Sequence, residues 1–184
     1  MRKIIALLSL FALLLGASPA AAETPAVGDK APDFTLRSLD GRQVSLSTVN
    51  AAGPLALVML RGYPGYQCPV CNRQVNDFLQ NAVGFDKAGA QVIFVYPGPS
   101  EQLQARAEEF TADKTLPTGF HFLLDPGYEF TNLYGLRWDA PRETAYPATF
   151  LLDKAGKIVF AKISDSHGGR TAAAEMVAKL AALR

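Results

Sequence analysis

The chain contains two cysteines, Cys68 and Cys71, and two residues separate them. Directly before them, residues 55–60 form an unbroken apolar run, which predicts a strand buried on both faces. After them, apolar residues recur at helical spacing as far as about Phe85, which predicts an amphipathic helix. A C-x-x-C pair where a core strand turns into a helix can cycle between a dithiol and a disulfide.

The position of each cysteine predicts a different role. Cys68 is expected at the helix N-cap, with Pro69 in the first helical position, where a missing N–H group costs nothing. Free backbone N–H groups and the positive end of the helix dipole there favour a thiolate. Cys71 lies one turn later on the apolar stripe. We therefore expect Cys68 to be the exposed nucleophile and Cys71 to be its covered partner.

Other uses of a cysteine pair are a structural disulfide or half of a metal site. A structural zinc ion needs about four ligands, and the chain's two histidines, His121 and His167, lie far apart in sequence. Haem attachment needs a histidine straight after the second cysteine, where this chain has Asn72. We therefore expect redox chemistry by the thiols themselves, with no metal and no cofactor.

Residues 1–22 have the organisation of a secretory signal peptide. A basic start is followed by an apolar stretch and by three alanines that end at Ala22. The apolar stretch is shorter than the ~20 residues of a spanning helix, so we expect cleavage after Ala22 and no stable membrane insertion. Residues 23–184 then form one domain. Export would place the cysteines in an oxidising compartment, so the expected location is periplasmic or secreted.

The charges of the chain are nearly balanced. It has 18 basic and 17 acidic residues, and no long run of one sign. Such a chain lacks the basic surface that nucleic acid or an anionic membrane attracts, so we expect neither as a partner.

The rest of the pattern alternates strands with helices. Alternating apolar residues around Asp40-Gly41 predict a hairpin. Further strands are expected at 92–95, 121–124, 148–152 and 158–163, and further helices at 100–112, 128–133 and 171–183. This order predicts an α/β fold, a three-layer α/β/α sandwich with a mixed sheet.

The segment Val27-Gly28-Asp29-Lys30-Ala31-Pro32-Asp33-Phe34-Thr35-Leu36, together with the cysteine loop, resembles the redoxin or AhpC/TSA (peroxiredoxin-like) group of the thioredoxin-like superfamily. The resemblance covers nearly the whole chain from Val27 to Leu183. It implies a thioredoxin fold with an added N-terminal β-hairpin, and an antioxidant oxidoreductase with a redox-active cysteine pair.

Within that superfamily the cysteine loop resembles two different signatures. The spacing Pro64-x-x-x-Cys68-x-x-Cys71 resembles the P-x-x-x-T/S-x-x-C of peroxiredoxins, in which the last cysteine attacks peroxide and the proline shields it. The same C-x-x-C resembles thioredoxins, in which the first cysteine is the nucleophile. The two resemblances assign opposite roles to Cys68 and Cys71.

A second segment, which begins at Tyr146-Pro147, resembles the cis-proline segment of thioredoxins. That resemblance implies a cis Tyr146–Pro147 bond, and a Tyr146 backbone that is offered to a substrate peptide. Peroxiredoxins place an arginine at about this point, where it lowers the cysteine pKa and polarises the peroxide. Arg142 and Arg137 are the nearby arginines that could take its place.

The expected substrate surface consists of Pro64, Tyr66, Tyr146 and Pro147. Because Pro147 has no side-chain donor, the sequence favours thiol–disulfide exchange with protein thiols, with a thioredoxin-like protein as electron donor. A thiol-dependent peroxidase that reduces hydroperoxides with Cys71 is the first alternative. A copper-binding thioredoxin-like metallochaperone is the second, in which the thiols would hold Cu(I).

Two carboxylates are further candidates near the cysteines. Asp77 and Asp125 could accept a proton close to Cys71, because buried carboxylates can act as general bases.

Overall fold

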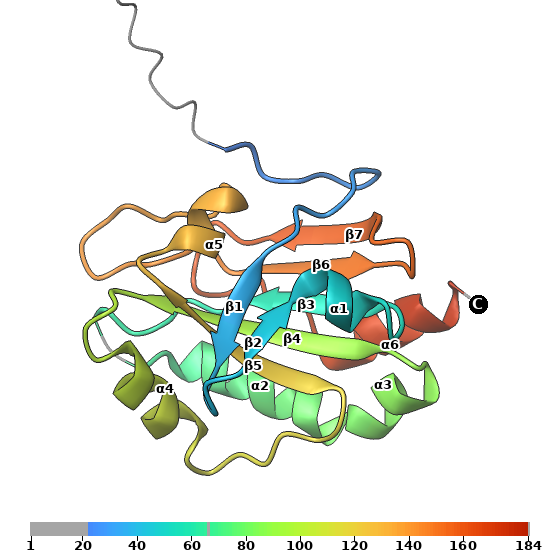
Figure 1. Ribbon diagram of the computed structural model, residues 1–184, viewed down its shortest axis with the longest axis horizontal. Helices are drawn as coiled ribbons and strands as arrows, with labels where there is room; N and C mark the ends of the chain where they lie inside the picture. The colour runs from blue at the N-terminus through green and yellow to red at the C-terminus, as the bar shows by residue number, and fades with distance from the viewer. Residues whose placement is uncertain (1–21, 66, 184) are drawn as a thin grey trace, which may run out of the picture.

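The computed structural model describes residues 22–65 and 67–183, so the predicted signal peptide lies, except for Ala22, outside the described residues. The described residues form one seven-stranded sheet, in the order β2-β1-β5-β4-β3-β6-β7, with helices on both faces (Figure 1). The elements are β1 (Thr35–Ser38), β2 (Gln43–Ser45), α1 (Leu46–Asn50), β3 (Leu55–Met59), α2 (Pro69–Gln80), α3 (Ala82–Lys87), β4 (Gln91–Gly98), α4 (Leu103–Thr111), β5 (Phe120–Pro126), α5 (Glu129–Leu133), β6 (Ala148–Leu152), β7 (Ile158–Ile163) and α6 (Ala173–Ala181). The predicted three-layer α/β/α sandwich is confirmed.

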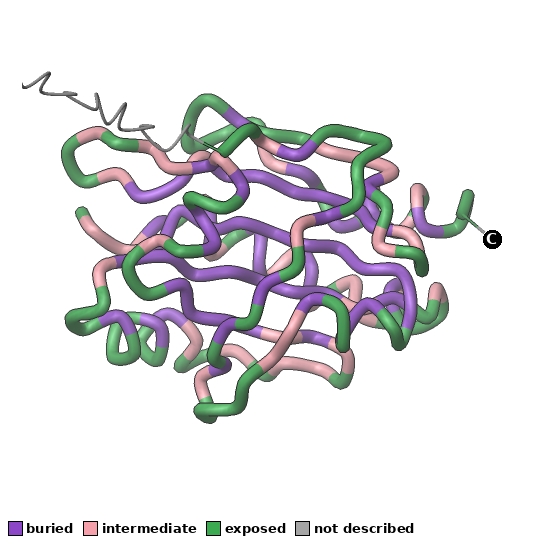
Figure 2. Tube along the Cα trace, turned by 45° about the horizontal axis from the view of Figure 1, so that its top comes forward, coloured by how far each residue is buried: buried purple, intermediate pink, exposed green. Residues whose placement is uncertain are grey.

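Strand β3 lies at the centre of the fold and separates two apolar cores. All five of its residues are buried, as the sequence predicts, and the buried central strands are purple in Figure 2. Alternate side chains enter opposite cores: Leu55, Leu57 and Met59 on one side, and Ala56, Val58 and the following Leu60 on the other. Helices α2, α3, α4 and α6 cover the second core, and α1 and α5 cover the first. This packing fixes the end of β3, from which the cysteine loop leaves.

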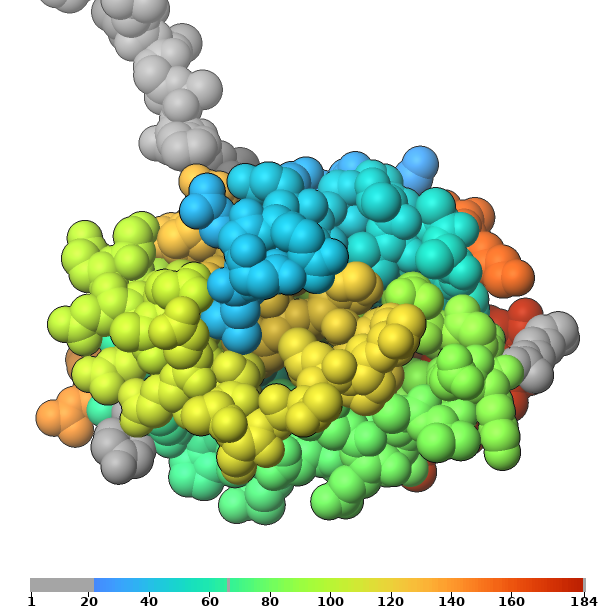
Figure 3. Space-filling model, turned by 60° about the horizontal axis from the view of Figure 1, so that its bottom comes forward, coloured from blue at the N-terminus to red at the C-terminus, as the bar shows by residue number. Residues whose placement is uncertain are grey.

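The N-terminal hairpin forms one edge of the sheet. Strands β1 and β2 pair antiparallel around Gly41, which has a positive φ of 84°, as the Asp-Gly signal predicts. Strand β1 also pairs with β5, and Gln104 of α4 donates to the carbonyl of Leu39 at 3.1 Å. Figure 3 shows the resulting surface, on which the blue hairpin lies beside the yellow-green α4.

The helices differ from the sequence prediction in several places. The long helix after the cysteines ends at Gln80, because the Asn81 side chain bonds back to the carbonyl of Asp77 at 2.8 Å and a separate helix, α3, follows. The next helix begins at Leu103, after Gln102 in the left-handed region, and not at Ser100. Helix α1 was not predicted; the Ser45 side chain caps it.

Among the described residues, no helix combines the length and the apolar character that a membrane crossing requires.

Gly62 is needed where the chain turns from β3 into the cysteine loop. Its φ is +74°, and a Cβ added there would lie 1.9 Å from the backbone oxygen of Pro97. A left-handed conformation alone costs an L-residue ~1–2 kcal/mol, and here a backbone clash adds to it. We expect Gly62→Ala to lower the free energy of unfolding by at least ~3 kcal/mol, measured by urea denaturation.

Gly41→Ala is the matched control, because Gly41 also has a positive φ but no atom lies within 4 Å of an added Cβ. Its cost should stay near ~1–2 kcal/mol. Equal urea midpoints for the two variants would contradict the role assigned to the Gly62 turn.

Candidate active site

Both cysteines occupy the start of α2, as the sequence predicts. Cys68 is the N-cap, with φ −82° and ψ 110°, and Pro69 is the first helical residue. The Cys71 backbone N–H points to the Cys68 sulfur at an N···S distance of 3.4 Å. Both side chains are free thiols. The helix start therefore directs a backbone donor at Cys68, which favours its thiolate.

The expected exposure of Cys68 is wrong. Cys68 is 4% exposed and Cys71 is 1% exposed, because α4 lies beside the start of α2 and its Phe110 joins the apolar cluster around Cys68. Cys68 nevertheless lines a cavity of about 460 Å³ between these two helices. The other lining residues are Gln67, Pro69, Asn72, Glu109, Phe110, Ala112, Asp113 and Lys114. Among the cavities described, this one reaches a cysteine.

An arginine that the sequence analysis did not propose lies against both sulfurs. The Nη2 atom of Arg170 is 3.3 Å from the sulfur of Cys71 and 3.9 Å from the sulfur of Cys68. The backbone N–H of Arg61 also points to the Cys71 sulfur, at 3.4 Å. The two sulfurs therefore lie against one cation and several backbone N–H donors.

The two thiols have pKa values that move in opposite directions. The hydrogen bond from the Cys71 thiol, aided by backbone N–H groups and by the charge of Arg170, lowers the pKa of Cys68 to about 5 against the opposing effect of burial. Burial raises the pKa of Cys71 well above its ordinary value. At neutral pH the arrangement is a Cys68 thiolate beside a Cys71 thiol, the order of acidity that the helix start predicts.

We expect the reduced chain to carry one thiolate at pH 7. The pKa of Cys68 is about 5 in the folded chain, and that of an unperturbed thiol is 9.0. Between these two pH values the unfolded state binds more protons than the folded state. The free energy of unfolding of the reduced chain therefore increases as the pH rises through this range. The ultraviolet absorbance of the thiolate, followed against pH, measures this directly. Cys68→Ser should lose the low-pH step, and a wild-type chain with no step below the ordinary thiol range would refute the assignment.

The loop between β7 and α6 supplies Arg170, and two side contacts orient it. Its Nε donates to the carbonyl of His167 at 3.0 Å, and its Nη1 donates to Gln74 on α2 at 3.0 Å. The amide of Gln74 in turn donates to the carbonyl of Thr171 at 3.3 Å. These contacts leave Nη2 of the guanidinium directed at the two sulfurs.

The sheet topology explains how Arg170 reaches the site. Strand β6 is antiparallel to both β3 and β7, so β7 runs in the same direction as β3. Residues that follow β7 therefore leave the sheet at the same edge as the cysteine loop that follows β3. The predicted hairpin of residues 148–152 and 158–163 already implies this direction for β7, and with it the position of the loop that carries Arg170.

A buried ion pair lies beside the cysteine loop. Arg61 is paired through its Nε with Glu143, and its Nη2 donates to the carbonyl of Arg142 at 2.8 Å. The other carboxylate oxygen of Glu143 lies 3.0 Å from Nε2 of His167. One carboxylate thus joins the cysteine loop to the loop that carries Arg170.

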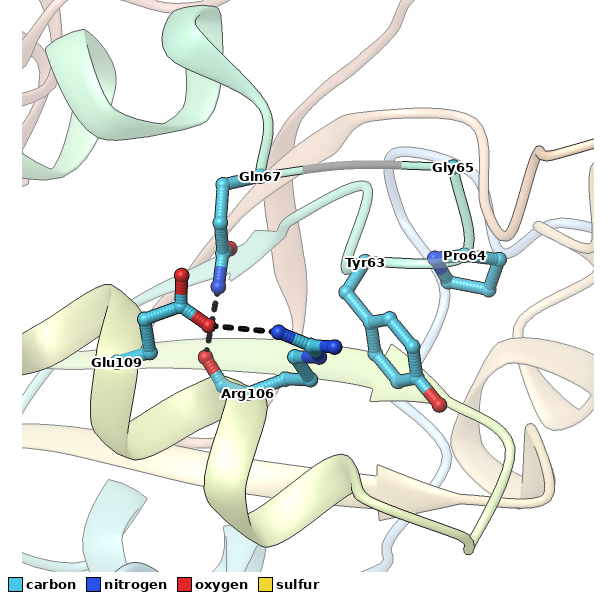
Figure 4. A pocket seen from close by; sticks show the side chains of 6 residues that line it. All are labelled: Tyr63, Pro64, Gly65, Gln67, Arg106 and Glu109. Atoms are coloured by element: carbon cyan, nitrogen blue, oxygen red, sulfur yellow. Dashed lines mark hydrogen bonds and ion pairs between the residues drawn. The ribbon is translucent and has the colours of Figure 1, made fainter.

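Of the predicted substrate residues, Pro64 lies next to a cavity and Tyr66 is outside the described residues. The cavity of about 260 Å³ is lined by Tyr63, Pro64, Gly65, Gln67, Arg106 and Glu109 (Figure 4). The amide of Gln67 donates to the carbonyl of Arg106 at 2.9 Å, which joins the cysteine loop to α4. Pro64 therefore lines a cavity beside the cysteine loop, and the lining of this cavity includes neither cysteine.

The expected cis bond before Pro147 is wrong, because the Tyr146–Pro147 peptide is trans. The preceding Ala145 pairs with Arg137 in an antiparallel bridge, and the N–H of Tyr146 donates to Leu136 at 2.9 Å. Extended pairing of this kind suits a trans chain. Of the Tyr146 backbone that the sequence offers to a substrate peptide, the N–H group is already bonded inside the protein.

The two arginines proposed from the sequence hold other positions. Arg137 donates to the carbonyls of Trp138 and Thr144, at 2.6 and 2.7 Å, and lies over the Tyr128 ring. Arg142 is exposed, and its backbone carbonyl accepts from Arg61. In the part of the chain that the structure describes, neither guanidinium contacts a cysteine. The guanidinium that lies against the sulfurs is that of Arg170.

The two proposed carboxylates act as helix caps. Asp77 accepts from the N–H of Ala173 at 2.7 Å, at the start of α6. Asp125 accepts from the N–H groups of Phe130 and Thr131, at 2.8 and 2.9 Å, and burial raises its pKa. Within residues 22–65 and 67–183 neither carboxylate contacts a sulfur, which leaves no support for a proton acceptor near Cys71.

Within the same ranges, no group of three or more histidine, cysteine, aspartate or glutamate side chains is placed to hold a metal ion.

Comparisons with known proteins point to one family. The sequence model of the AhpC/TSA family matches residues 27–161. A putative peroxiredoxin of Mycobacterium tuberculosis (strain H37Rv) is 31% identical over 150 residues, which cover 79% of this chain and 89% of the relative. A chloroplastic peroxiredoxin Q of Oryza sativa subsp. japonica is 35% identical over 133 residues, 72% of this chain and 57% of that protein.

Solved structures of peroxiredoxins share the fold. Mycobacterium tuberculosis AhpC has a TM-score of 0.70 at 20% identity, over 87% of this chain and 93% of its own. Peroxidoxin BcpB of Mycobacterium tuberculosis has a TM-score of 0.67 at 22% identity, over 86% of this chain and 97% of its own. With the family match and the curated relatives, the conclusion follows that this chain belongs to the AhpC/TSA family and is a peroxiredoxin-like oxidoreductase.

Proposed function

We propose that this protein is a thiol-dependent peroxidase that reduces hydroperoxides with the Cys68–Cys71 pair. The observation that carries the proposal is the guanidinium of Arg170, which lies 3.3 Å from one sulfur and 3.9 Å from the other. The sequence favoured disulfide exchange because Pro147 cannot supply a donor for peroxide reduction. Arg170 removes that objection, and the peroxiredoxin relatives support the same alternative.

The first step of the proposed cycle is attack on the peroxide. The Cys68 thiolate forms an S–O bond with one peroxide oxygen, the O–O bond breaks, and the other oxygen leaves with the electron pair. Cys68 becomes a sulfenic acid, and the leaving oxygen takes a proton to give water or an alcohol. Arg170 stabilises the negative charge that grows on that oxygen, because its charged, planar fork presents several N–H donors.

The second step closes the disulfide. The Cys71 thiol attacks the sulfenic sulfur of Cys68, a Cys68–Cys71 disulfide forms, and water leaves. Two thiols of a reductant then restore the dithiol by exchange and become a disulfide themselves. The family supports a thioredoxin-type reductant for this step.

We assign the attack to Cys68 because of its surroundings. Cys68 lines the 460 Å³ cavity and has the lowered pKa, whereas the pKa of Cys71 is raised by burial. The resemblance of Pro64-x-x-x-Cys68-x-x-Cys71 to the peroxiredoxin signature assigns the attack to Cys71 instead. Both orders end in the same disulfide.

Peroxide consumption by the purified chain with a small dithiol reductant tests the function. The wild type should consume hydrogen peroxide catalytically, and without reductant its mass should fall by two hydrogens as the disulfide forms. The variant in which both cysteines are serine is the control. A wild-type chain that reacts no faster than free cysteine would overturn the proposal.

We also propose that residues 1–22 direct export of the chain, since they combine a basic start, an apolar stretch and a small-residue cleavage site. The enzyme would then work outside the cytoplasm. The intact mass of the protein from its native host decides this. A mature chain that still begins at Met1 would refute it.

A further inference from the structure

We propose that Glu143 is a positioning residue, whose carboxylate holds Arg61 and the loop of Arg170 on the cysteine pair. The inference rests on the proposed peroxidase function and deepens it. One carboxylate oxygen of Glu143 accepts from Nε of Arg61. The other lies 3.0 Å from Nε2 of His167. The two partners come from the two loops that supply donors to the sulfurs.

On the Arg61 side, the carboxylate fixes the residue whose backbone N–H donates to Cys71. The side chains of Arg61 and Glu143 are 10% and 14% exposed, so water screens this ion pair little. The carbonyl of Arg142 accepts a second bond from the same guanidinium at 2.8 Å. With its side chain held at two points, Arg61 keeps its peptide N–H directed at the Cys71 sulfur.

On the Arg170 side, the carboxylate contacts the outer part of the loop between β7 and α6 through His167. His167, Gly168 and Gly169 are exposed, and inside the loop the Ser164 hydroxyl donates to the carbonyl of Gly168 at 2.6 Å. The ring of His167 contacts Glu143, and its carbonyl accepts from Nε of Arg170 at 3.0 Å. Glu143 is therefore linked to the sulfurs through two residues, first His167 and then Arg170.

Hydrogen bonds also hold the segment that carries the carboxylate. Arg137 donates to three carbonyls of residues 138–144, that of Glu143 among them at 3.4 Å. A Cβ added at Gly65 would lie 2.8 Å from the Cβ of Arg142, so this segment packs directly against the cysteine loop. A group that positions catalytic donors needs such support, because a displacement of about 1 Å can cost ~10²-fold in rate.

A double-mutant cycle on the oxidation rate with hydrogen peroxide tests the positioning role. His167→Ala removes an exposed side chain and breaks the link between Glu143 and the loop, without leaving Arg61 unpaired. It should slow oxidation by about tenfold. In an Arg170→Ala background the same change should have no further effect, because it acts through Arg170. A wild-type rate for His167→Ala, or additive losses in the double variant, would overturn the proposal.

Glu143→Gln tests the carboxylate itself, with Glu175→Gln as the matched control, since Glu175 lies near Lys179 on α6 at 3.9 Å. Glu143→Gln should slow oxidation and change the fluorescence of Trp138, the single tryptophan, whose ring lies 5.4 Å from that of His167. The control should do neither. If Glu143→Gln does not fold, the double-mutant cycle of His167→Ala and Arg170→Ala still tests the positioning role.

A titration of the Cys68 thiolate separates this proposal from the peroxidase function. The charge of Arg170 lowers the pKa of Cys68, so a displaced Arg170 in His167→Ala should raise that pKa relative to the wild type. This shift is expected whether or not the chain reduces peroxide. An unchanged titration would refute the positioning role even if peroxidase activity is found.

Discussion

Replacing Arg170 with alanine is expected to slow the oxidation of the reduced chain by hydrogen peroxide by about 10²–10³-fold, the usual effect of removing one transition-state donor. The guanidinium is the cation that contacts both sulfurs, at 3.3 and 3.9 Å. Arg170→Lys keeps the charge but loses the fork of donors, so it should recover only part of the rate. Stopped-flow measurement of the first oxidation gives these rates without the reductant step.

Arg142→Ala is the matched control for this experiment. Arg142 is close to the cysteine loop, and its hydrogen bond with Arg61 uses its backbone carbonyl, so its side chain should be dispensable. If Arg142→Ala collapses the rate and Arg170→Ala does not, the assignment of the peroxide donor is wrong.

Replacing Cys68 with serine is expected to lower the rate of peroxide reduction by at least about 10³-fold, because it removes the attacking sulfur. Cys71→Ser should still react once with peroxide and then remain a sulfenic acid, since no second thiol is present to close the disulfide. Trapping with a sulfenic-acid reagent, followed by mass spectrometry, locates the oxidised residue in each variant.

The choice of serine in the Cys68→Ser variant makes this experiment decisive. Cys68→Ser gives the chain the sequence P-x-x-x-S-x-x-C, the peroxiredoxin pattern that ends at Cys71. If Cys71 is the attacking sulfur, this variant keeps its peroxide reactivity and Cys71 carries the trapped sulfenic acid. That result would reverse the roles assigned to the two cysteines and leave the peroxidase function standing.

Local features of the site could be predicted from the sequence. Cys68 at the N-cap, Pro69 in the first turn and Cys71 on the apolar face follow from helix-start preferences and from apolar spacing. The five buried residues of β3 follow from an unbroken apolar run. Each depends only on neighbours within a turn or a strand.

Features set by distant segments could not be predicted in this way. Arg170 meets Cys71 across 99 positions, and only the direction of β7 relative to β3 brings them together. Cys68 is buried by α4, a helix that begins more than thirty positions later. The trans bond at Pro147 belongs to a bridge between Arg137 and Ala145, which the resemblance to thioredoxins did not suggest.

The sequence-based preference for disulfide exchange over peroxide reduction depended on the same kind of distant contact. Pro147 offers no donor, and that chemical argument holds. The preference for disulfide exchange assumed that a donor for peroxide must come from the segment around Pro147. In the structure, the loop before α6 brings Arg170 to the sulfurs instead. A side chain missing at one position of a site can be replaced from another loop at the same sheet edge.

The most direct test of the peroxidase account compares two oxidants of the reduced wild-type chain, hydrogen peroxide and a protein disulfide, at matched concentrations in stopped flow. With Arg170 at the sulfurs, peroxide should oxidise the Cys68–Cys71 pair faster than the disulfide does, and Arg170→Ala should abolish most of the difference. Faster oxidation by the protein disulfide, with a peroxide rate that is unchanged in Arg170→Ala, would contradict the account.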